Sequence, residues 1–402
     1  MKILMVNKFL HPNGGSETYV FHLGKQLVEM GHEVQYFGME HEGRMVGNRM
    51  NCYTSDMDFH SSKLQKLSYP FKIIYSGEAK KKIIMVLNDF KPDVVHLNNF
   101  NFQLTPSILY GIKDYKEKSG REVKIIFTAH DSQLVCPNHL MRRYLTGEKC
   151  RKCLGGKVWN CTKYRCIHGS FIKSLLGSIE GYTYRWLGSY RFIDRIICPS
   201  YFMKDVLVTN PDLKDRITVM HNFVADIGRE GTPGEDKQNY VLYFGRYSEE
   251  KGIRTLLSVC KELADIPFVF IGSGPLEEEV NKFSNIQNKG FLEGDELYKG
   301  ISRAKFCVFT SECYENCPFT VMEAQMYGTP VIGADIGGVP ELIVQGKTGE
   351  LFQSGNAAEL ADKIRTLWND SKKLEEYTEA CRNVVFDSVE DYCIKLVELY
   401  TS

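Results

Sequence analysis

Short apolar runs alternate with amphipathic stretches along the first half of the chain. The runs are Ile3–Val6, Val34–Phe37, Val94–Leu97, Lys124–Phe127, Arg195–Ile197 and Ile217–Met220. Between the first two lies Ser16–Met30, where apolar residues recur at helical spacing. Runs rich in Val and Ile suit strands that are buried on both faces, and a helix between successive strands is typical of βαβ units. The pattern predicts a parallel, doubly wound sheet.

The same alternation restarts after a polar stretch. Ala225–Asn239 is rich in Gly, Pro, Asp and Glu and predicts a linker. Further strand-like runs are Tyr240–Phe244, Phe268–Ile271, Lys305–Phe309 and Pro330–Gly333. We therefore predict an α/β fold with two Rossmann-like domains, 1–222 and 239–385, joined by a linker, 223–238, and followed by a helix within 386–402. Two such domains imply a central cleft that the C-terminal ends of the strands face.

Two carboxylates stand eight positions apart in Glu315-Asn-Cys-Pro-Phe-Thr-Val-Met-Glu323. Proline disfavours helix for the preceding residue but suits a first helical turn, so Pro318 predicts a loop at Glu315 and a helix from about Phe319. The free N–H groups at that helix start would face an anion. With Glu323 two turns on, the segment could bind a sugar, a phosphate and a ribose in sequence. A solvated loop Glu and an ordinary surface Glu are the alternative.

A cationic loop follows the first strand of the second half. Arg246 offers a planar fork of donors and Lys251 a point charge, and together they could neutralise a diphosphate. When a sugar leaves a nucleoside diphosphate, negative charge develops on the β-phosphate, and two fixed cations would stabilise it. The alternative is a surface loop with salt bridges to Glu249 and Glu250.

Two candidate features of a ligand-binding site follow strands in the first half of the chain. Gly14 and Gly15 precede a helix, and glycines let backbone amides approach a phosphate closely. The alternative is a turn in which Ser16 caps the helix. His130 stands at the C-terminal end of a central strand, facing the predicted cleft. For His130 the alternative is a buried histidine bonded to a backbone carbonyl.

The segment from Glu315 continues past Glu323 as Ala-Gln-Met-Tyr-Gly-Thr-Pro-Val-Ile-Gly-Ala-Asp-Ile-Gly-Gly-Val-Pro-Glu-Leu-Ile. It resembles the C-terminal signature of the retaining glycosyltransferases of family four, and the resemblance extends over essentially the whole chain. The resemblance implies the GT-B fold, a nucleoside-diphosphate-sugar donor and a C-terminal helix that crosses back onto the first domain. It also implies that Glu315 binds the donor sugar and Glu323 the nucleotide ribose.

The same resemblance implies roles for the other loops. Arg246 and Lys251 match the cations at the donor phosphates, and His130 matches a histidine near the donor sugar. The Gly14-Gly15 loop matches one that contacts donor phosphate and acceptor. We therefore expect His130, Glu315, Arg246 and Lys251 to be catalytic. The other expected donor contacts are Asn316, Phe319, Thr320 and the backbone around Gly272, Gly274 and Leu292.

One position departs from the family pattern. The family usually has Gly where this chain has Pro318, and proline offers no backbone N–H. The amide contacts to the sugar must therefore come from Cys317, Phe319 and Thr320.

Composition narrows the functional classes. The chain has 50 Lys and Arg and 50 Asp and Glu, so its net charge of zero does not suggest a nucleic-acid-binding protein. No run of about 18 apolar residues occurs, so no membrane span is expected. The N-terminal apolar run is too short for a signal peptide. We therefore expect a cytoplasmic protein whose 13 cysteines are reduced.

A cysteine-rich insert spans 136–168. Cys150 and Cys153, with Cys161 and Cys166 downstream, have zinc-like spacing, and Cys136 is an alternative ligand. The other interpretations are buried thiols or a redox pair. A similar insert occurs in many bacterial polysaccharide glycosyltransferases of family four. A structural zinc here would order the loop that follows the predicted active-site histidine.

Basic residues are concentrated in 136–195, which holds twelve Lys or Arg against three Asp or Glu, a net charge of +9. The interleaved aromatic residues are Tyr144, Trp159, Tyr164, Phe171, Tyr182, Tyr184, Trp186 and Tyr190. Such a surface suits an anionic membrane face or a lipid diphosphate acceptor. A nucleic acid and a merely solvated face are the alternatives.

The leading hypothesis is a retaining hexosyltransferase of surface polysaccharide biosynthesis. Its donor would be a nucleotide sugar, with a UDP-sugar favoured, and its acceptor a glycan or a lipid-linked sugar at the inner face of the cell membrane. The expected route is front-face substitution, in which the leaving phosphate takes the acceptor proton and Glu315 positions sugar hydroxyls. No catalytic metal is expected, because the one Asp-x-Asp, Asp56–Asp58, lies far from these motifs.

Other functions fit the motifs less well. A GT-B epimerase or hydrolase of nucleotide sugars would leave the basic, aromatic surface without a role. A zinc-knuckle nucleic-acid-binding protein would explain the insert alone. A Rossmann oxidoreductase is disfavoured because the Gly-x-Gly-x-x-Gly fingerprint is missing.

Overall fold

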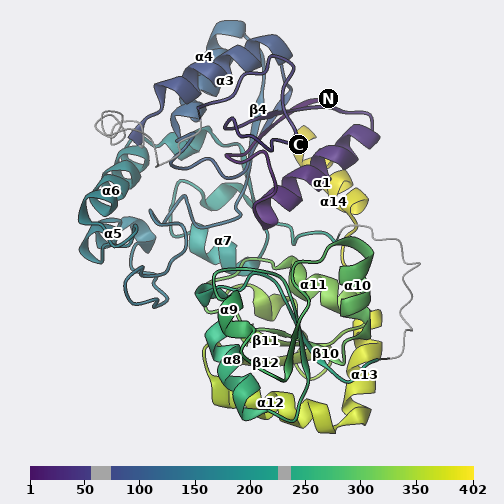
Figure 1. Ribbon diagram of the computed structural model, residues 1–402. Helices are drawn as coiled ribbons and strands as arrows, with labels where there is room; N and C mark the ends of the chain where they lie inside the picture. The colour runs from purple at the N-terminus through teal and green to yellow at the C-terminus, as the bar shows by residue number, and fades with distance from the viewer. Residues whose placement is uncertain (56–73, 225–236) are drawn as a thin grey trace. The chain divides into compact units, whose positions relative to one another are not determined.

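The computed structural model describes residues 1–55, 74–224 and 237–402. These residues form two compact units (Figure 1). Unit 1 consists of Met1–His221 and Val389–Ser402, and unit 2 of Asn222–Ser388. Asp56, Asp58 and most of the predicted linker lie outside the described residues.

Unit 1 is built on a six-stranded parallel sheet in the order β2-β1-β3-β4-β5-β6. Its strands are β1 (Lys2–Val6), β2 (Glu33–Phe37), β3 (Val94–Leu97), β4 (Lys124–Thr128), β5 (Arg195–Cys198) and β6 (Ile217–Val219). Strand β3 is buried along its whole length, as expected for a strand covered by helices on both faces. The strand order reverses between β1 and β3. The loops after these two strands therefore flank the crevice where such sheets bind ligands.

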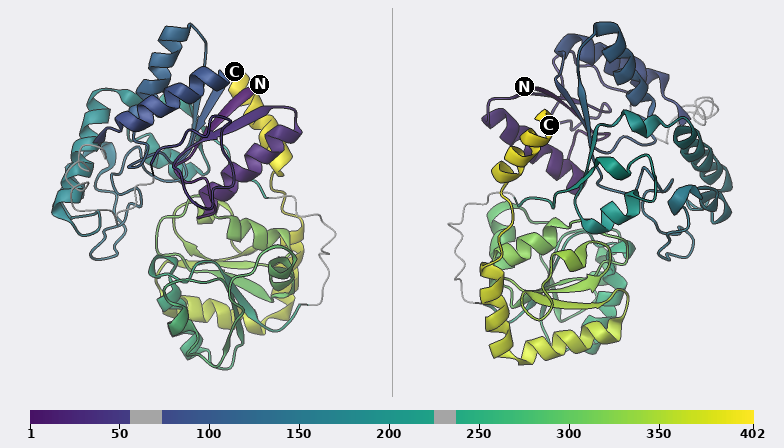
Figure 2. Two further views of the ribbon diagram at one scale, coloured as in Figure 1. Left: turned by 45° about the horizontal axis from the view of Figure 1, so that its top comes forward. Right: turned by 180° about the vertical axis from the view of Figure 1, so that it is seen from behind.

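The helices of unit 1 are α1 (Gly15–Glu29), α3 (Gly77–Phe90), α4 (Ser107–Ser119), α5 (Trp159–Lys163), α6 (Phe171–Trp186), α7 (Tyr201–Leu207) and α14 (Val389–Thr401). Helix α14 comes from the end of the chain and lies beside α1 in both views (Figures 1 and 2). The Tyr392 hydroxyl lies 2.9 Å from that of Tyr19, and the Tyr400 hydroxyl 2.6 Å from Nδ1 of His96. The buried side chains of Tyr19 and His96 are each also hydrogen-bonded to the hydroxyl of Thr128, at the end of β4. Helix α14 is thus an integral part of unit 1.

Unit 2 repeats the architecture with a six-stranded parallel sheet in the order β12-β11-β10-β7-β8-β9. Its strands are β7 (Val241–Phe244), β8 (Phe268–Ile271), β9 (Ile286–Asn288), β10 (Phe306–Phe309), β11 (Val331–Asp335) and β12 (Gly349–Gln353). Its helices are α8 (Ile253–Glu262), α9 (Glu277–Val280), α10 (Gly294–Arg303), α11 (Phe319–Met326), α12 (Ala357–Asn369) and α13 (Ser371–Arg382). Here the strand order reverses between β7 and β10, which pair with each other.

The prediction of two Rossmann-like domains with parallel sheets is confirmed. Two strands, β9 and β12, were not among the predicted elements. Both lie at the edges of the unit 2 sheet. Strand β9 is Ile-Gln-Asn and is nowhere fully buried, so it lacks the apolar run that marks the central strands.

Candidate active site

The loop after β7 carries the two predicted cations of unit 2. Arg246 is exposed, and Lys251 ends a short 3-10 helix, Glu249–Lys251. The backbone after it is held tightly against the end of β10. Gly252 has φ +72, and a Cβ there would lie 1.9 Å from the carbonyl oxygen of Thr310. The Thr310 hydroxyl in turn donates a hydrogen bond to the Lys251 carbonyl at 2.8 Å. Only glycine permits this approach, so the sequence at 252 fixes where Lys251 stands.

Lys251 forms an ion pair with Glu315. Its Nζ lies 2.6 Å from Oε1 of Glu315, and the Ser311 hydroxyl donates to the same oxygen at 2.6 Å. Burial tends to raise the pKa of the Glu315 carboxyl, but the Lys251 ammonium and these hydrogen bonds outweigh it and hold that pKa below its usual range. The pKa of Lys251 is raised because Glu315 outweighs the effect of burial. Both groups are therefore charged at neutral pH.

The backbone of Glu315 is held by a glycine loop that follows β11. Gly337 has φ +61, and a Cβ there would lie 2.1 Å from the Glu315 carbonyl oxygen. The amide of Gly338 donates a hydrogen bond to that oxygen at 2.9 Å. Loops that follow three neighbouring strands of the sheet thus hold the Glu315 carboxylate in place. The loop after β7 provides Lys251, the loop after β10 contains Glu315 itself, and the loop after β11 holds its backbone.

Helix α11 begins at Phe319 with Pro318 as its N-cap, so the prediction of its start is confirmed. Pro318 is extended, with φ −70 and ψ 123, and makes no side-chain cap bond. The carbonyl of Cys317 accepts a hydrogen bond from the side chain of Asn222 at 2.8 Å, and the Cys317 thiol accepts one from the Asn222 amide. Cys317 is therefore buried within unit 2. Its hydrogen bonds connect the loop before α11 to Asn222, the first residue of the unit.

Glu323 lies on α11, and burial raises the pKa of its carboxyl to about 7. Its electrostatic neighbours are Tyr298 and Tyr327, whose rings stack at 5.3 Å. Within the described residues this carboxylate forms no ion pair. Near pH 7 it can therefore both donate and accept a hydrogen bond, as a pair of ribose hydroxyls requires.

A small cavity of about 30 Å³ brings together residues from the loops after β7 and β10 and from α11. Its lining is Tyr243, Phe244, Gly245, Arg246, Lys251, Phe309, Thr310, Ser311 and Thr320. Two cations and a hydroxyl from the first turn of α11 thus share one space. Amides at a helix start, a guanidinium and an ammonium form an anion-binding arrangement.

Gly272 and Gly274 support this cavity from the loop after β8. A Cβ at Gly272 would lie 1.9 Å from the Gly245 carbonyl oxygen, and a Cβ at Gly274 would lie 2.5 Å from that of Tyr247. Both glycines therefore let the β8 loop pack against the loop that carries the predicted cations. Leu292 lies elsewhere, in a separate cavity of about 310 Å³ with residues of β8, β9 and α10. The structure does not bring Leu292 to the lining of the cationic cavity.

In unit 1, His130 follows β4 and is bonded to a side chain rather than to a backbone carbonyl. Its Nε2 lies 2.8 Å from Oδ1 of Asn98, the residue after β3, and its ring meets that of Tyr19 edge-on at 4.7 Å. Burial lowers the pKa of His130 to about 3, so the imidazole is neutral at pH 7. A neutral, partly exposed imidazole suits a hydroxyl ligand better than a phosphate.

The glycine loop of unit 1 is organised by Glu17, which the sequence analysis did not identify. Helix α1 starts at Gly15, and Gly14 is its N-cap; no side chain caps it, so Ser16 is not a cap. The buried Glu17 carboxylate accepts hydrogen bonds from Asn7 at 2.8 Å and from Ser16 at 3.0 Å. Gly14 has φ 177 and room for a Cβ, which would lie 3.7 Å from Glu17. The fold itself therefore does not require glycine at 14.

Several polar residues of this region follow strands directly. They are Asn7 and Lys8 after β1, Asn98 and Asn99 after β3, and Asp131 after β4. Burial raises the pKa of Asp131 to about 6, although Lys8 opposes the shift. Their position just beyond predicted strands was a signal that could have identified them, because ligands bind at that edge of a parallel sheet.

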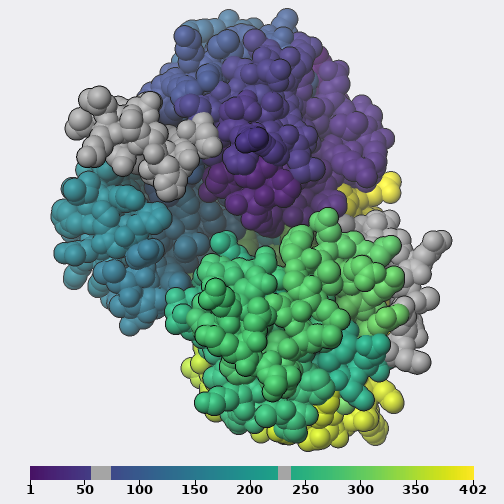
Figure 3. Space-filling model, viewed as in Figure 1, coloured from purple at the N-terminus to yellow at the C-terminus, as the bar shows by residue number. Residues whose placement is uncertain are grey.

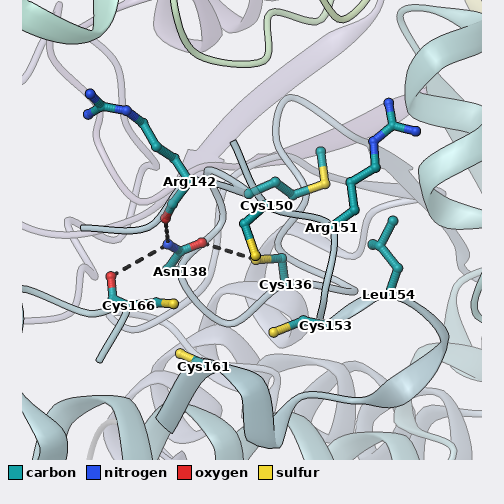
Figure 4. A pocket seen from close by; sticks show the side chains of 10 residues that line it. Cys136, Asn138, Arg142, Cys150, Arg151, Cys153, Leu154, Cys161 and Cys166 are labelled. Atoms are coloured by element: carbon teal, nitrogen blue, oxygen red, sulfur yellow. Dashed lines mark hydrogen bonds between the residues drawn. The ribbon is translucent and has the colours of Figure 1, made fainter. Parts of the chain in front are cut away.

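The cysteine insert gathers five cysteines around one small cavity (Figure 4). The Cys136 thiol donates a hydrogen bond to the side-chain oxygen of Asn138 at 3.0 Å, and the Cys153 thiol donates one to the Val158 carbonyl at 4.0 Å. Cys150 also lines the cavity. All four predicted zinc ligands, Cys150, Cys153, Cys161 and Cys166, and the alternative ligand Cys136 therefore line the same cavity. Across the described residues, no group of three or more His, Cys, Asp or Glu side chains is placed so that it could hold a metal ion.

Comparison with known proteins gives matches over nearly the whole chain. A model named Glycosyltransferase Family 4 matches residues 13–226, and one named Glycosyl transferases group 1 matches residues 226–384. A 155-residue segment is 36% identical to the sulfoquinovosyl transferase SQD2 of Arabidopsis thaliana, covering 37% of this chain and 30% of that protein. An uncharacterized 42.6 kDa protein from the cps region of Klebsiella pneumoniae is 23% identical over 365 residues, 85% of this chain and 87% of that one.

Among solved structures, HepE of Anabaena in complex with UDP superimposes with a TM-score of 0.66. The two chains are 16% identical, and the superposition covers 100% of each. The similarity shows that they share the GT-B fold.

We expect Gly337→Ala to destabilise unit 2 more than Gly346→Ala does. Both glycines have positive φ, +61 and +74, so alanine is strained at either position by about 1–2 kcal/mol. Nothing lies within 4 Å of a Cβ at Gly346, whereas one at Gly337 would strike Glu315. Unfolding in urea should therefore show at least twice the loss of stability for Gly337→Ala. Equal losses would mean that the glycine loop does not hold Glu315.

Proposed function

The chain belongs to Glycosyltransferase Family 4, and on that premise we propose that it transfers a sugar from a nucleoside-diphosphate sugar with retention of configuration. The observation that supports this proposal most directly is the charge of the Glu315 carboxylate and the hydrogen bonding of its two oxygens. Its Oε1 accepts hydrogen bonds from Lys251 and Ser311, while its Oε2 accepts none within the described residues. A charged carboxylate held by one oxygen and open at the other is suited to bind sugar hydroxyls.

The donor diphosphate would bind in the cationic cavity. Arg246 provides a bidentate guanidinium and Lys251 an ammonium, beside the free amides at the start of α11. Negative charge develops on the β-phosphate as the sugar leaves, and fixed cations stabilise that charge without a metal ion. We therefore propose a metal-independent reaction.

The proposed route is front-face substitution. The bond between the anomeric carbon and the β-phosphate oxygen breaks, the acceptor oxygen attacks the same face, and the leaving phosphate takes the acceptor proton. In this route Glu315 binds hydroxyls and is not the nucleophile, in agreement with its pairing to Lys251. Glu323 would bind the ribose hydroxyls, because its half-protonated carboxyl can donate and accept. His130, which is neutral, would bind a sugar hydroxyl through Nδ1, because its Nε2 is hydrogen-bonded to Asn98.

A UDP-sugar is the favoured donor, and surface polysaccharide synthesis the favoured role. The support for UDP is the fold shared with HepE, whose structure holds that nucleotide. The support for the role is the similarity over most of the chain to a protein of the Klebsiella cps region. The transferred group would be a hexose, and the acceptor a glycan or a lipid-linked sugar.

The acceptor would meet unit 1 at a membrane surface. The segment from the insert to α6 forms a broad exposed part of unit 1 (Figure 3). On α6, Ile172, Ile179 and Trp186 are 67%, 42% and 86% exposed. They stand seven residues apart, two helical turns each, so they form one apolar line on the helix. The net charge of +9 over 136–195 would attract anionic lipid. No helix among the described residues is long and apolar enough to cross a bilayer.

We expect Arg246→Ala to reduce turnover about a hundredfold. Losing one charge-assisted contact in the transition state costs on the order of 3 kcal/mol. Lys251→Ala should do the same, with an added loss of stability because Glu315 is left unpaired.

Arg254→Ala is the matched control, since Arg254 is an exposed arginine of the same region that pairs with Glu249 and Glu279 instead. Sugar transfer from a UDP-sugar, with and without EDTA, is the measurement. Near-normal rates for both cation variants would refute the diphosphate site, and loss of activity in EDTA would refute the metal-independent route.

We expect the double variant Ile172→Ser, Trp186→Ser to lose binding to anionic lipid vesicles. The wild-type protein should bind such vesicles at low salt and release them as salt rises, because each basic residue near the surface contributes about 1 kcal/mol that salt screens. Val385→Ser is the matched control, since Val385 is 86% exposed like Trp186 but belongs to unit 2. Vesicle sedimentation would measure binding. If the wild-type protein ignores anionic vesicles at low salt, the acceptor is soluble.

A further inference from the structure

We propose that Asp131 and His139 of unit 1 together bind one hydroxyl group of the acceptor sugar, and that the carboxylate selects a neutral sugar over an acidic one. This inference rests on the proposed function, because it names a contact to the acceptor of that reaction. His139 stands within the insert, 136–168. The insert would therefore take part in acceptor recognition.

A short closed loop after β4 brings the two side chains together. Asp131 is the third residue after the end of that strand at Thr128. Ser132 closes the loop, because its amide donates a hydrogen bond to the His139 carbonyl at 3.2 Å and its hydroxyl donates another at 2.5 Å. His139 is thereby held beside Asp131, near the carboxyl edge of the sheet, where parallel sheets bind ligands.

Both side chains have unused hydrogen-bonding capacity. Oδ1 of Asp131 accepts a hydrogen bond from the Gln133 amide at 2.8 Å, but within the described residues its Oδ2 accepts none. Nε2 of His139 is buried without a partner, and the whole side chain is only 10% exposed. Its Nδ1 lies 3.7 Å from Oδ2 of Asp131, too far for a direct hydrogen bond. Because a buried polar group without a partner is costly, such a pair indicates a further partner.

The gap between Nδ1 of His139 and Oδ2 of Asp131 suits one hydroxyl group. An oxygen about 2.8 Å from each atom would complete a triangle with them at ordinary hydrogen-bond lengths. A hydroxyl can donate to the carboxylate and accept from Nδ1 when that nitrogen carries the proton. An ammonium group cannot accept, and a carboxylate or a fully ionised phosphate cannot donate, so none of these meets both requirements.

The charges of the two groups agree with this assignment. Burial raises the pKa of Asp131 to about 6, although Lys8 opposes the shift, so the carboxyl is mostly ionised at neutral pH. Burial lowers the pKa of His139 to about 3, and Lys8 adds to that effect, so the imidazole is neutral. The pair therefore presents one negative charge, and Asp131 is reachable because its side chain is 24% exposed. An acidic sugar bound there would meet a like charge in a partly buried site.

The imidazole of His139 is held by Phe102, from the loop after β3. The two rings stack at 4.6 Å with an interplanar angle of 11°. Both residues have a left-handed backbone, with φ +64 at Phe102 and +65 at His139. That conformation is uncommon for residues other than glycine, and it persists only where the surrounding structure holds it, most often at binding sites. The stacking fixes the plane of the imidazole and hence the directions of its nitrogens.

The test is the binding of neutral sugars to the full-length protein without any donor. The probes are the methyl glycosides of glucose, galactose, mannose and N-acetylglucosamine, and saturation-transfer NMR should detect binding of at least one. Asp131→Asn keeps the oxygen that accepts from Gln133, but it should weaken binding about tenfold or more, because a hydrogen bond to a charged group is lost. Asp93→Asn is the matched control and should bind like the wild type. Asp93 also accepts a backbone hydrogen bond, from Lys2, but it precedes β3 at the other end of the strands.

Selectivity for a neutral sugar is tested with the uronic acid that corresponds to the bound hexose. It should bind the wild-type protein at least about tenfold more weakly than the neutral sugar, and the difference should shrink in Asp131→Asn, which has no charge at this position. The proposal is overturned if the wild type binds none of the four hexosides, if Asp131→Asn binds them as well as the wild type does, or if the uronide binds as tightly as the neutral sugar.

Two variants of His139 give an independent result. His139→Asn suits a left-handed backbone and can place an amide N–H where Nδ1 stands, so it should retain hexoside binding. His139→Ala should lose it. Equal binding by both variants would remove the histidine from the site.

Calorimetry with UDP separates this inference from the proposed function. UDP should bind the wild type and Asp131→Asn equally, because the donor diphosphate is proposed to bind unit 2. Absence of UDP binding in the wild type would refute the donor site, whereas the hexoside measurements, made without donor, decide the role of Asp131 and His139 alone.

Discussion

The ion pair between Lys251 and Glu315 is the interaction on which the rest of the proposed donor site depends. A buried carboxylate without a partner would take up a proton or destabilise unit 2. The pair is possible because the strand order of unit 2 reverses between β7 and β10, which places the loops after these strands side by side. Gly252 and Gly337 then bring the backbones into contact at distances that no other residue would allow. The same pair keeps Lys251 charged at the edge of the cavity that contains Arg246.

Unit 1 has the same architecture as unit 2, but the side chains at its strand ends are of a different chemical kind. Its residues at the strand ends form a hydrogen-bonded network of mostly neutral groups around Glu17, Asn98 and His130. Burial keeps His130 uncharged, and helix α14 completes the layer behind it through Tyr19. The charged groups suited to phosphate therefore lie in unit 2, and neutral groups suited to hydroxyls lie in unit 1. This division agrees with a donor diphosphate on one unit and a sugar acceptor on the other.

Sequence patterns were sufficient for the central strands and for the loop and helix around Glu315. Val- and Ile-rich runs mark strands buried on both faces, and Pro318 marks the start of α11. Edge strand β9 carries no such pattern. The hydrogen-bond partners of His130 and Glu17 could not be found from spacing, because Asn98 and Asn7 come from other strands. Spacing also could not show that Cys136 lines the same cavity as Cys150, Cys153, Cys161 and Cys166.

A double-mutant cycle on Lys251 and Glu315 tests the account most directly. The variants are Lys251→Met, Glu315→Gln and the double variant, and the quantity is the free energy of unfolding in urea. If the two groups stabilise one another, the double variant will lose less stability than the sum of the single variants, by about 1–3 kcal/mol. Additivity within about 0.5 kcal/mol would show that the ion pair does not organise the site.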